Sequence, residues 1–356
     1  MDGRGTPIDK ASAFLHEHLL WLLLGSYALA VFWPSPGVIA RAPVFGEVSV
    51  FGESESLTPP LLLLASLLFN AGLGAPLGRF RGLARRSAPL FAGLAANVLI
   101  PLAYIFAVMV LMSTWPRPDE AQSLLAGLAL VVAMPIAGSS TAWAQNAEGD
   151  LALSLGLVFG STLLSPLTTP MVLHAVGLMA RGSYAMDLHR VATCGTDGFL
   201  IVGIIVPSIL GIAARCAVGG RRVDAAKPAL RLANVLALLL LNYSNAAVSL
   251  PRAIARTEPG YFAVLVGIVV GLCAMTFTAG WSIARLLGAG RDQRASLMFG
   301  LGLNNNGTGL VLASVALPNH PRAMLPIILY NLVQHLAAGV ASRVTRDDRA
   351  VRRRVP

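Results

Sequence analysis

The sequence predicts an all-α, polytopic membrane protein with about ten transmembrane helices, and three observations support this fold class. Hydrophobic residues make up 55% of the 356-residue chain, charged residues only 12%, and the mean hydropathy is +0.69. A soluble domain usually carries about 25% charged residues, so this chain has too few charges to cover a water-facing surface. Its apolar runs are each close to the roughly 20 residues that a spanning helix needs. The lipid bilayer is therefore the expected solvent for most of the chain.

The expected spans divide into two halves of five. In chain order they cover residues 18–38, 57–77, 88–114, 123–147, 150–180, 197–218, 228–250, 260–287, 295–318 and 322–342. Because five is odd, the second half enters the membrane upside down relative to the first, as inverted repeats do in secondary transporters. The expected organisation is a cytoplasmic N-terminal segment, a first five-helix repeat, a linker, a second five-helix repeat and a basic cytoplasmic tail, at 1–17, 18–180, 181–196, 197–342 and 343–356.

The distribution of basic residues predicts which loops face the cytoplasm. With the N-terminus inside, 20 of the 27 basic residues fall in cytoplasmic segments and 7 in outer ones. This bias is the one that the positive-inside rule describes, so both termini are expected in the cytoplasm and the protein in the cell inner membrane. The net charge of +10 comes from short loops between apolar runs, such as residues 78–87. Such clusters are typical of anionic-lipid contacts and not of a nucleic-acid interface.

Two expected spans are interrupted by polar residues. The first break, residues 134–141, reads Met-Pro-Ile-Ala-Gly-Ser-Ser-Thr. Pro135 removes a helical hydrogen bond and pushes the residue before it away from helical angles. The second break, residues 300–309, contains four glycines, three consecutive asparagines and a threonine. Both breaks occupy the fourth span of their half.

Irregular backbone at membrane depth persists only where it is buried in protein or lines a wet cavity. Two breaks in corresponding helices of two halves therefore predict a transport site where they meet. Freed carbonyl and side-chain oxygens suit a small cation, and the N-termini of half-helices suit an anion. We expect the cation near Ser140, Thr141, Asn304, Asn305, Asn306 and Thr308, and the substrate cavity near Pro135, Gly138, Asn97, Asn242 and Asn245. Packing kinks and interhelical hydrogen bonds are the alternative explanation for these small and polar residues.

The residues around the two breaks resemble the bile acid:sodium symporter family. The stretch MPIAGSSTAWAQNAEGDLALSLGLVFGSTLLSPLTTP at 134–170 is similar to the fourth and fifth helices of that family, and GLNNNGTGLVLASVAL at 302–317 to its ninth helix. Weaker likeness runs from about Leu67 to the end of the chain. The resemblance implies a core domain with two crossing discontinuous helices, a panel domain, and sodium-coupled uptake of an organic anion by alternating access with two bound sodium ions.

Carried over by motif position, the resemblance assigns sodium-binding roles to particular residues. The family's Ser-Asn pair falls on Ser140 and Thr141, and its helix-five serine on Ser154. The family's Gln and Asn in the ninth helix fall on Asn304 and Asn305.

The chain departs from the family pattern at two of these positions. A threonine of the fifth helix is replaced by Val158, and a glutamate that serves both sodium sites is replaced by Gly300. Hard cations favour charged oxygen ligands, so the loss of the carboxylate weakens the expectation of sodium coupling. His174 and His335, each in the helix after a break, are candidates for proton coupling, because histidine titrates near physiological pH. A neutral histidine that hydrogen-bonds a neighbouring helix is the alternative for both.

The sequence thus predicts a secondary transporter of a small organic anion, cation-coupled with sodium as the first candidate ion. A proton-coupled or uncoupled carrier on the same fold, and a non-transporting membrane receptor, are the alternatives. The sequence contains no HExxH or GxSxG motif and no paired intramembrane aspartates, so no enzyme activity is expected. No cofactor is expected beyond the coupling ion.

Overall fold

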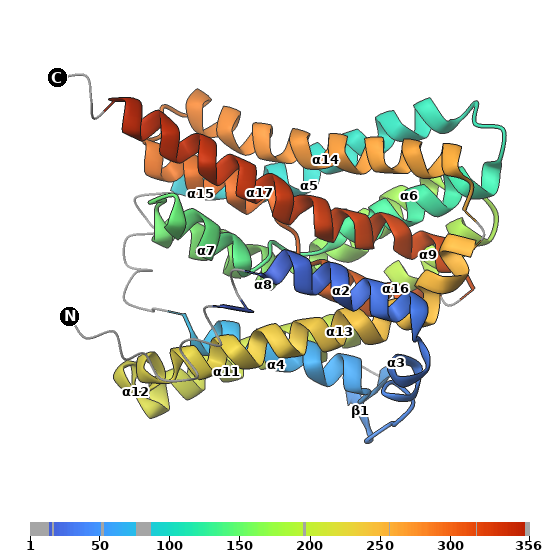
Figure 1. The fold of residues 1–356 in the computed structure, drawn as a ribbon, viewed down its shortest axis with the longest axis horizontal. Helices are drawn as coiled ribbons and strands as arrows, with labels where there is room; N and C mark the ends of the chain where they lie inside the picture. The colour runs from blue at the N-terminus through green and yellow to red at the C-terminus, as the bar shows by residue number, and fades with distance from the viewer. Residues whose placement is uncertain are drawn as a thin grey trace.

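The computed structural model describes residues 14–15, 18–50, 53–75, 87–194, 197–255, 257–317 and 319–352, and it is helical apart from one short hairpin (Figure 1). Its elements are α2 (Leu19–Phe32), α3 (Ser35–Ile39), β1 (Glu47–Val50), β2 (Glu53–Ser56), α4 (Pro59–Leu73), α5 (Ser87–Met112), α6 (Pro118–Ala133), α7 (Ser139–Asn146), α8 (Leu151–Met179), α9 (Gly182–Cys194), α10 (Asp197–Leu200), η2 (Ile201–Ile205), α11 (Val206–Val218), α12 (Gly220–Ala225), α13 (Lys227–Ala255), α14 (Pro259–Leu286), α15 (Arg291–Gly302), α16 (Asn306–Ala316), η3 (Pro321–Ala323) and α17 (Met324–Arg352).

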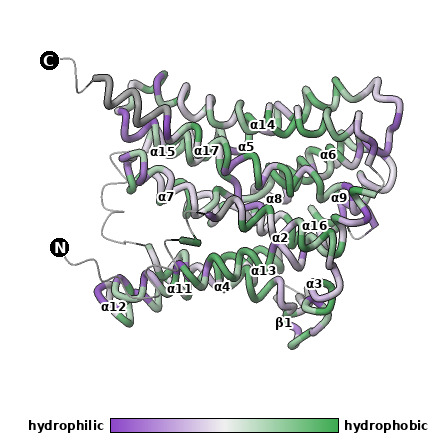
Figure 2. Tube along the Cα trace, in the orientation of Figure 1, coloured by the Kyte–Doolittle hydropathy of each residue, from purple (hydrophilic) through white to green (hydrophobic). Residues whose placement is uncertain are grey.

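Six helical segments in the described part of the chain are long and apolar enough to cross a membrane. They cover Ser87–Met112, Leu151–Met179, Gly198–Val218, Lys227–Ala255, Pro259–Leu286 and Pro321–Arg343. Two shorter apolar helices cover Trp21–Phe32 and Pro59–Leu73. Figure 2 shows hydrophobic residues along the middle of the long helices and hydrophilic residues near their ends. The protein is therefore an all-helical, polytopic membrane protein, as the sequence predicts.

The structure differs from the expected element boundaries in four places. The run expected as one span at 18–38 is divided into α2 and α3, because Pro34 and Pro36 cannot continue the preceding helix. The segment at 39–56, expected as a loop, contains the antiparallel β1–β2 hairpin. The segment at 181–196, expected only as a linker, holds the helix α9. The tail expected to begin at residue 343 continues α17 as far as Arg352.

The helices pack in two groups. In the first, called here the panel group, α4 packs against α11 and α13, and α13 also packs against α2 and α3. Gly72 and Gly211 allow the close approach of α4 and α11, since a Cβ on either residue would meet the backbone of the other helix. Asn70 on α4 donates to Asn234 on α13 at 2.9 Å. The panel group lies along the lower side of Figure 1.

The second group, called here the crossing group, contains α5 to α8 and α14 to α17. Within it α6 packs on α5, α8 and α17, while α15 packs on α14, α7 and α8. In Figure 1 the molecule has two ends along its longest axis: β1 lies near one, called here the hairpin end, and α12 and the start of α15 lie near the other, the tail end. The helix α6 runs from the hairpin end to the middle, and α15 runs from the tail end to the middle.

Candidate functional site

The two breaks meet and pair through their backbones. Residues Ile136 and Asn304 form an isolated antiparallel bridge. The backbone N–H of Ala137 donates to the carbonyl oxygen of Leu303 at 2.8 Å, and that of Asn305 donates to the carbonyl oxygen of Pro135 at 2.9 Å. Each irregular segment thus supplies hydrogen-bond partners to the other, as backbone in a membrane requires. The prediction that the two breaks come together is confirmed.

The first break is held in place by hydroxyl groups of α8. Pro135 ends α6, and Met134 before it adopts an extended conformation with a ψ of 145°. Ser161 accepts a hydrogen bond from the backbone N–H of Ile136 at 3.0 Å. Thr169 donates to the carbonyl oxygen of Ala133 at 2.7 Å. The polar residues of α8 therefore satisfy backbone groups that the proline leaves unpaired.

The second break is held by a glutamine that the sequence analysis did not single out. Gln334 on α17 accepts from the backbone N–H of Asn304 at 3.0 Å and donates to its carbonyl oxygen at 3.2 Å. Gln334 also donates to Asn331 at 3.3 Å, and Asn331 donates to Tyr27 on α2 at 2.9 Å. Asn331 lies three residues before Gln334 on the same helix face, and this spacing is the signal in the sequence that could have identified the pair.

Most of the predicted site residues present oxygen atoms that have no partner within the described protein. A buried polar group without a partner costs roughly 1–3 kcal/mol, so a cluster of them indicates a place for a ligand, an ion or water. The unpartnered buried atoms on predicted residues are Oδ1 of Asn97, Oγ of Ser140, Oγ of Ser154, Oδ1 of Asn304, Oδ1 of Asn306, Oγ1 of Thr308 and both amide atoms of Asn242 and of Asn245.

The other predicted residues at the two breaks differ in burial. Thr141 and Asn305 are half-buried, and Asn305 also caps α16 by accepting from the backbone N–H of Thr308 at 3.4 Å. Pro135 and Asn97 line a small cavity of about 10 Å³ beside the first break, a volume that admits about one water molecule. Gly138 is exposed, and a Cβ placed on it would meet no atom within 4 Å.

On the panel side, Asn242 and Asn245 lie in the half of α13 that packs on α16. Leu241 approaches the start of α16, since a Cβ on Gly307 would lie 3.5 Å from the Cδ2 of Leu241. Asn245 lies four residues after Leu241 and so shares its face of α13. Both asparagines are completely buried. The structure thus places the predicted panel residues on the helix that covers the second break.

Leu157 fills the space beside Gly300, the position where the family resemblance of the sequence implies a glutamate. A Cβ on Gly300 would lie 2.9 Å from the Cδ1 of Leu157, and a Cβ on Gly93 would lie 2.7 Å from its Cδ2. Leu157 is completely buried, and its neighbour Val158, where the resemblance implies a threonine, is also buried. Two glycines on α5 and α15 therefore form a socket that this leucine fills, and the region is apolar.

The oxygen atoms that the crossing offers as candidate ligands for a cation are neutral. In the part of the chain that the structure describes, no group of three His, Cys, Asp or Glu side chains could hold a metal ion. Ser140 on α7 and Ser154 on α8 contribute hydroxyls, and Asn304 contributes an amide oxygen. Such ligands suit a weakly bound monovalent cation better than a divalent one, which prefers carboxylates.

The two histidines that were proton-coupling candidates occupy different surroundings. His174 is exposed near the end of α8, and its Nδ1 lies 3.1 Å from the Nδ1 of His189 on α9. It follows Ser161 by 13 residues, which is about 20 Å along a helix, so the structure does not bring it to the crossing. His335 is half-buried on α17 directly after Gln334.

Burial at the crossing differs between its two sides. On α7, which runs toward the tail end, Ser139, Ala142, Gln145 and Asn146 are exposed. On α16, which runs toward the hairpin end, residues 306–313 are all buried. The half of α13 nearer the hairpin end is buried between residues 241 and 250 except at Tyr243 and Val248, whereas residues 227–240 are mostly half-buried or exposed. The polar crossing is therefore more accessible from the tail end.

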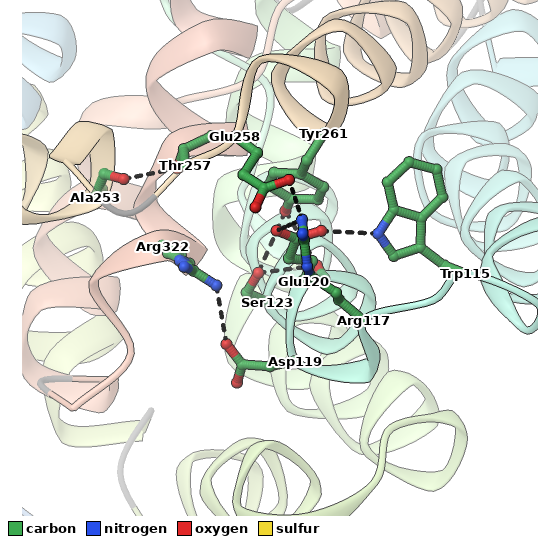
Figure 3. A network of polar contacts seen from close by, with 10 residues as sticks. All are labelled: Trp115, Arg117, Asp119, Glu120, Ser123, Ala253, Thr257, Glu258, Tyr261 and Arg322. Atoms are coloured by element: carbon green, nitrogen blue, oxygen red, sulfur yellow. Dashed lines mark hydrogen bonds and ion pairs between the residues drawn. The ribbon is translucent and has the colours of Figure 1, made fainter.

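A charged network joins the ends of three helices at the hairpin end (Figure 3). Arg117 pairs with Glu258, and Arg322 with Asp119 at 3.2 Å. Glu120 is only 2% exposed, and it accepts a hydrogen bond from the Trp115 indole at 2.8 Å. A cavity of about 360 Å³ opens among these charges. The network connects the start of α6 to the start of α14 and to η3, and the sequence analysis did not anticipate it.

Comparisons with known proteins agree with this architecture. A family model described as the Sodium Bile acid symporter family matches residues 61–252, which is more than half of the chain and extends from α4 into α13. A protein of Bacillus subtilis (strain 168), described as uncharacterized protein YbaS, is 27% identical over 219 residues, which cover 61% of this chain and 67% of that protein. The chain therefore belongs to the sodium bile acid symporter family and is a secondary transporter, not an enzyme.

Proposed function

We propose that this transporter carries a small organic anion across the cell membrane by alternating access, with the crossing of the two breaks as its binding site. The observation that carries the proposal is the cluster of unpartnered buried oxygens on both broken helices, where the two backbones pair. A scaffold or a receptor without transport has no use for such costly groups at membrane depth. This favours the transporter over the receptor alternative.

The proposed topology has ten membrane crossings in two inverted repeats. The six long segments, the two shorter apolar helices and the two interrupted pairs α6–α7 and α15–α16 are the crossings. The antiparallel pairing of the breaks supports the inversion, because the two chain directions oppose each other there. The panel group and the crossing group are the two moving parts. The bias of 20 basic residues against 7 supports a topology with the tail end, and both termini, on the cytoplasmic side of the inner membrane.

The electrostatics of the crossing support an anionic substrate. The helices α7 and α16 both begin at the crossing, at Ser139 and Asn306. Helix N-termini carry partial positive charge and unpaired N–H groups, which favour a carboxylate. The amides of Asn242, Asn245 and Asn306 supply neutral donors and acceptors beside it. The substrate is thus a small molecule that is both negatively charged and polar.

Coupling to a single monovalent cation, with sodium as the first candidate, is the mode that fits the hydroxyls of Ser140, Thr141 and Ser154 and the oxygens of Asn304, Asn305 and Thr308. An uncoupled carrier is the second candidate, and one observation favours it. Leu157 fills the space next to Gly300, where the family glutamate would neutralise the cation charge. Proton coupling through His335 is a third candidate on the same fold, because His335 is half-buried directly after Gln334, which hydrogen-bonds to the second break.

Uptake of a metabolite library into proteoliposomes, with and without an inward sodium gradient, tests the proposal. We expect one or more small organic anions to accumulate, and Asn305→Ala to reduce their uptake at least tenfold, because the substitution removes an amide from the crossing. His174→Gln is the matched control, since His174 is exposed and outside the crossing. Equal uptake by wild type and Asn305→Ala would contradict the assigned site. Uptake that ignores the sodium gradient would select the uncoupled carrier.

A further inference from the structure

Arg41 connects the two groups of helices near the hairpin end. It follows α3, which is held on α13 because the backbone N–H of Gly37 donates to the Tyr243 hydroxyl at 3.2 Å. From there the Arg41 side chain reaches across to the crossing group, where its Nη2 donates to the Oγ of Ser314 on α16 at 2.8 Å. The guanidinium thus stands at the boundary between the panel group and the crossing group.

Half of this guanidinium has no partner. The Nη1 of Arg41 is buried and makes no hydrogen bond, and none of the ion pairs among the described residues includes Arg41. Burial lowers the pKa of Arg41 below its ordinary value, because the charged form loses water and gains no carboxylate in return. A desolvated cation without a counter-charge is unfavourable, so this position is suited to a negatively charged ligand.

The geometry of the free group defines the ligand chemistry. Guanidinium presents its N–H donors in a planar fork that matches the two oxygens of a carboxylate. The Ser314 hydroxyl accepts from the Nη2 of Arg41 and donates its own proton to the carbonyl oxygen of Val311 at 2.6 Å, so it orients the guanidinium and leaves Nη1 as the donor for the ligand. The site is separate from the crossing, because Ser314 lies eight residues beyond the start of α16, about 12 Å along the helix.

We propose that Arg41 is an anion-binding residue at the hairpin-end mouth of the carrier, where it binds a carboxylate in the boundary between the two helix groups. That this carboxylate belongs to the transported anion rests on the proposed function. The anion-binding site itself does not, because it follows from the buried and unpaired donor of Arg41. The alternative is a structural role, in which the Arg41–Ser314 hydrogen bond only holds the two helix groups together. The experiment must distinguish this role from anion binding.

The test uses the purified full-length protein and acetate as the probe. Thermal unfolding is compared in sodium acetate and in sodium chloride at equal ionic strength. We expect acetate to raise the unfolding temperature of wild type, because a ligand that binds the native state stabilises it. Arg41→Gln should lose this shift, and Arg41→Lys should keep part of it, since lysine retains the charge without the fork. Ser314→Ala removes the hydrogen bond between Arg41 and α16 but keeps the charge of Arg41, so it should keep most of the shift in unfolding temperature.

Arg190→Gln is the matched control for the loss of one positive charge. Arg190 is 74% exposed on α9, and we expect its variant to respond to acetate as wild type does. No acetate shift in wild type, or an equal shift in wild type and Arg41→Gln, would overturn the proposal. Equal loss of the shift in Arg41→Gln and Ser314→Ala would assign the structural role instead. None of these outcomes depends on whether the metabolite library yields a substrate, so the two proposals fail separately.

Discussion

At the scale of single residues, Gly300 stands where the family resemblance of the sequence implies a glutamate, and this bears on the cation coupling that we propose. Gly300 and Gly93 leave room that Leu157 fills, and Val158 extends the apolar surface. Ser140 and Ser154 keep their unpartnered hydroxyls close in sequence to these changes. Under the proposed cation coupling, the ligands would therefore be neutral oxygens without a carboxylate from position 300. The affinity of such a site for a cation should be lower than that of a site with a carboxylate.

Returning the carboxylate tests this interpretation. Gly300→Glu should lower the unfolding temperature, because a Cβ would lie 2.9 Å from Leu157 and the added charge would be buried. Overpacking alone typically costs about 1–3 kcal/mol, and Gly300→Ala measures that part. Sodium should restore stability to Gly300→Glu more than potassium does, and should leave Gly300→Ala unchanged. If both variants melt at the same temperature in both salts, the carboxylate does not reach the cation ligands.

At the scale of elements, the breaks could be predicted from the sequence, whereas their supports could not. Pro135 and the glycine- and asparagine-rich segment at 300–309 disfavour a helix by local chemistry, which a sequence displays directly. Gln334 looks like an isolated polar residue in an apolar span, and its pairing with Asn304 depends on tertiary packing. The packing role of Leu157 likewise depends on Gly93 and Gly300, which lie on two other helices.

The helix α9 shows the same limit in another form. Tyr184, Leu188 and Val191 are buried at helical spacing, but the short polar segment between two long apolar spans led us to expect only a linker. The structure fastens α9 to the crossing group at two points. The Tyr184 hydroxyl donates to Asp119 at 3.0 Å, and Asp187 pairs with His320 at 3.1 Å. Burial and the neighbouring Asp119 raise the pKa of Tyr184, so it stays a neutral donor at physiological pH.

Removal of the Asp187–His320 interaction should lower the local stability of α9. Asp187→Asn takes away the carboxylate that faces His320, so amide hydrogen exchange in residues 182–194 should become several-fold faster, as expected when local opening costs less free energy. Arg190→Gln serves as the comparison, because it removes only the exposed ion pair of Arg190 with Asp187 at 3.5 Å and leaves the contact of Asp187 with His320. Unchanged exchange in Asp187→Asn would mean that the buried apolar face alone determines the stability of α9.

At the scale of the whole molecule, the uneven burial around the crossing describes one conformation of the carrier. The start of α7 is exposed toward the tail end, whereas α16 and the facing half of α13 are buried. At the hairpin end, Arg41 and Ser314 connect the panel group to the crossing group. Under the proposed topology, the less buried side of the crossing faces the cytoplasm.

Cysteine accessibility measures this asymmetry. In a background without Cys194, Cys216 and Cys273, a water-soluble thiol reagent should label Ser139→Cys rapidly and Asn245→Cys at least tenfold more slowly, because only the first position is exposed. In inside-out vesicles, labelling of Ser139→Cys should be faster than in right-side-out vesicles if the tail end is cytoplasmic. Equal labelling of both positions, or the reverse order, would contradict the described conformation.

The reciprocal hydrogen bonds between the two breaks restrict how this chain is able to fold and to evolve. The backbone N–H of Ala137 bonds to the carbonyl oxygen of Leu303, and that of Asn305 bonds to the carbonyl oxygen of Pro135. Each half of the chain thus supplies backbone hydrogen-bond partners to the other. A fragment ending after α8 would enter the bilayer with donors and acceptors unmatched, and each would cost several kcal/mol in hydrocarbon. The two breaks therefore pair only after α15 and α16 have been synthesised, and a sequence change that displaces one break also removes hydrogen-bond partners of the other.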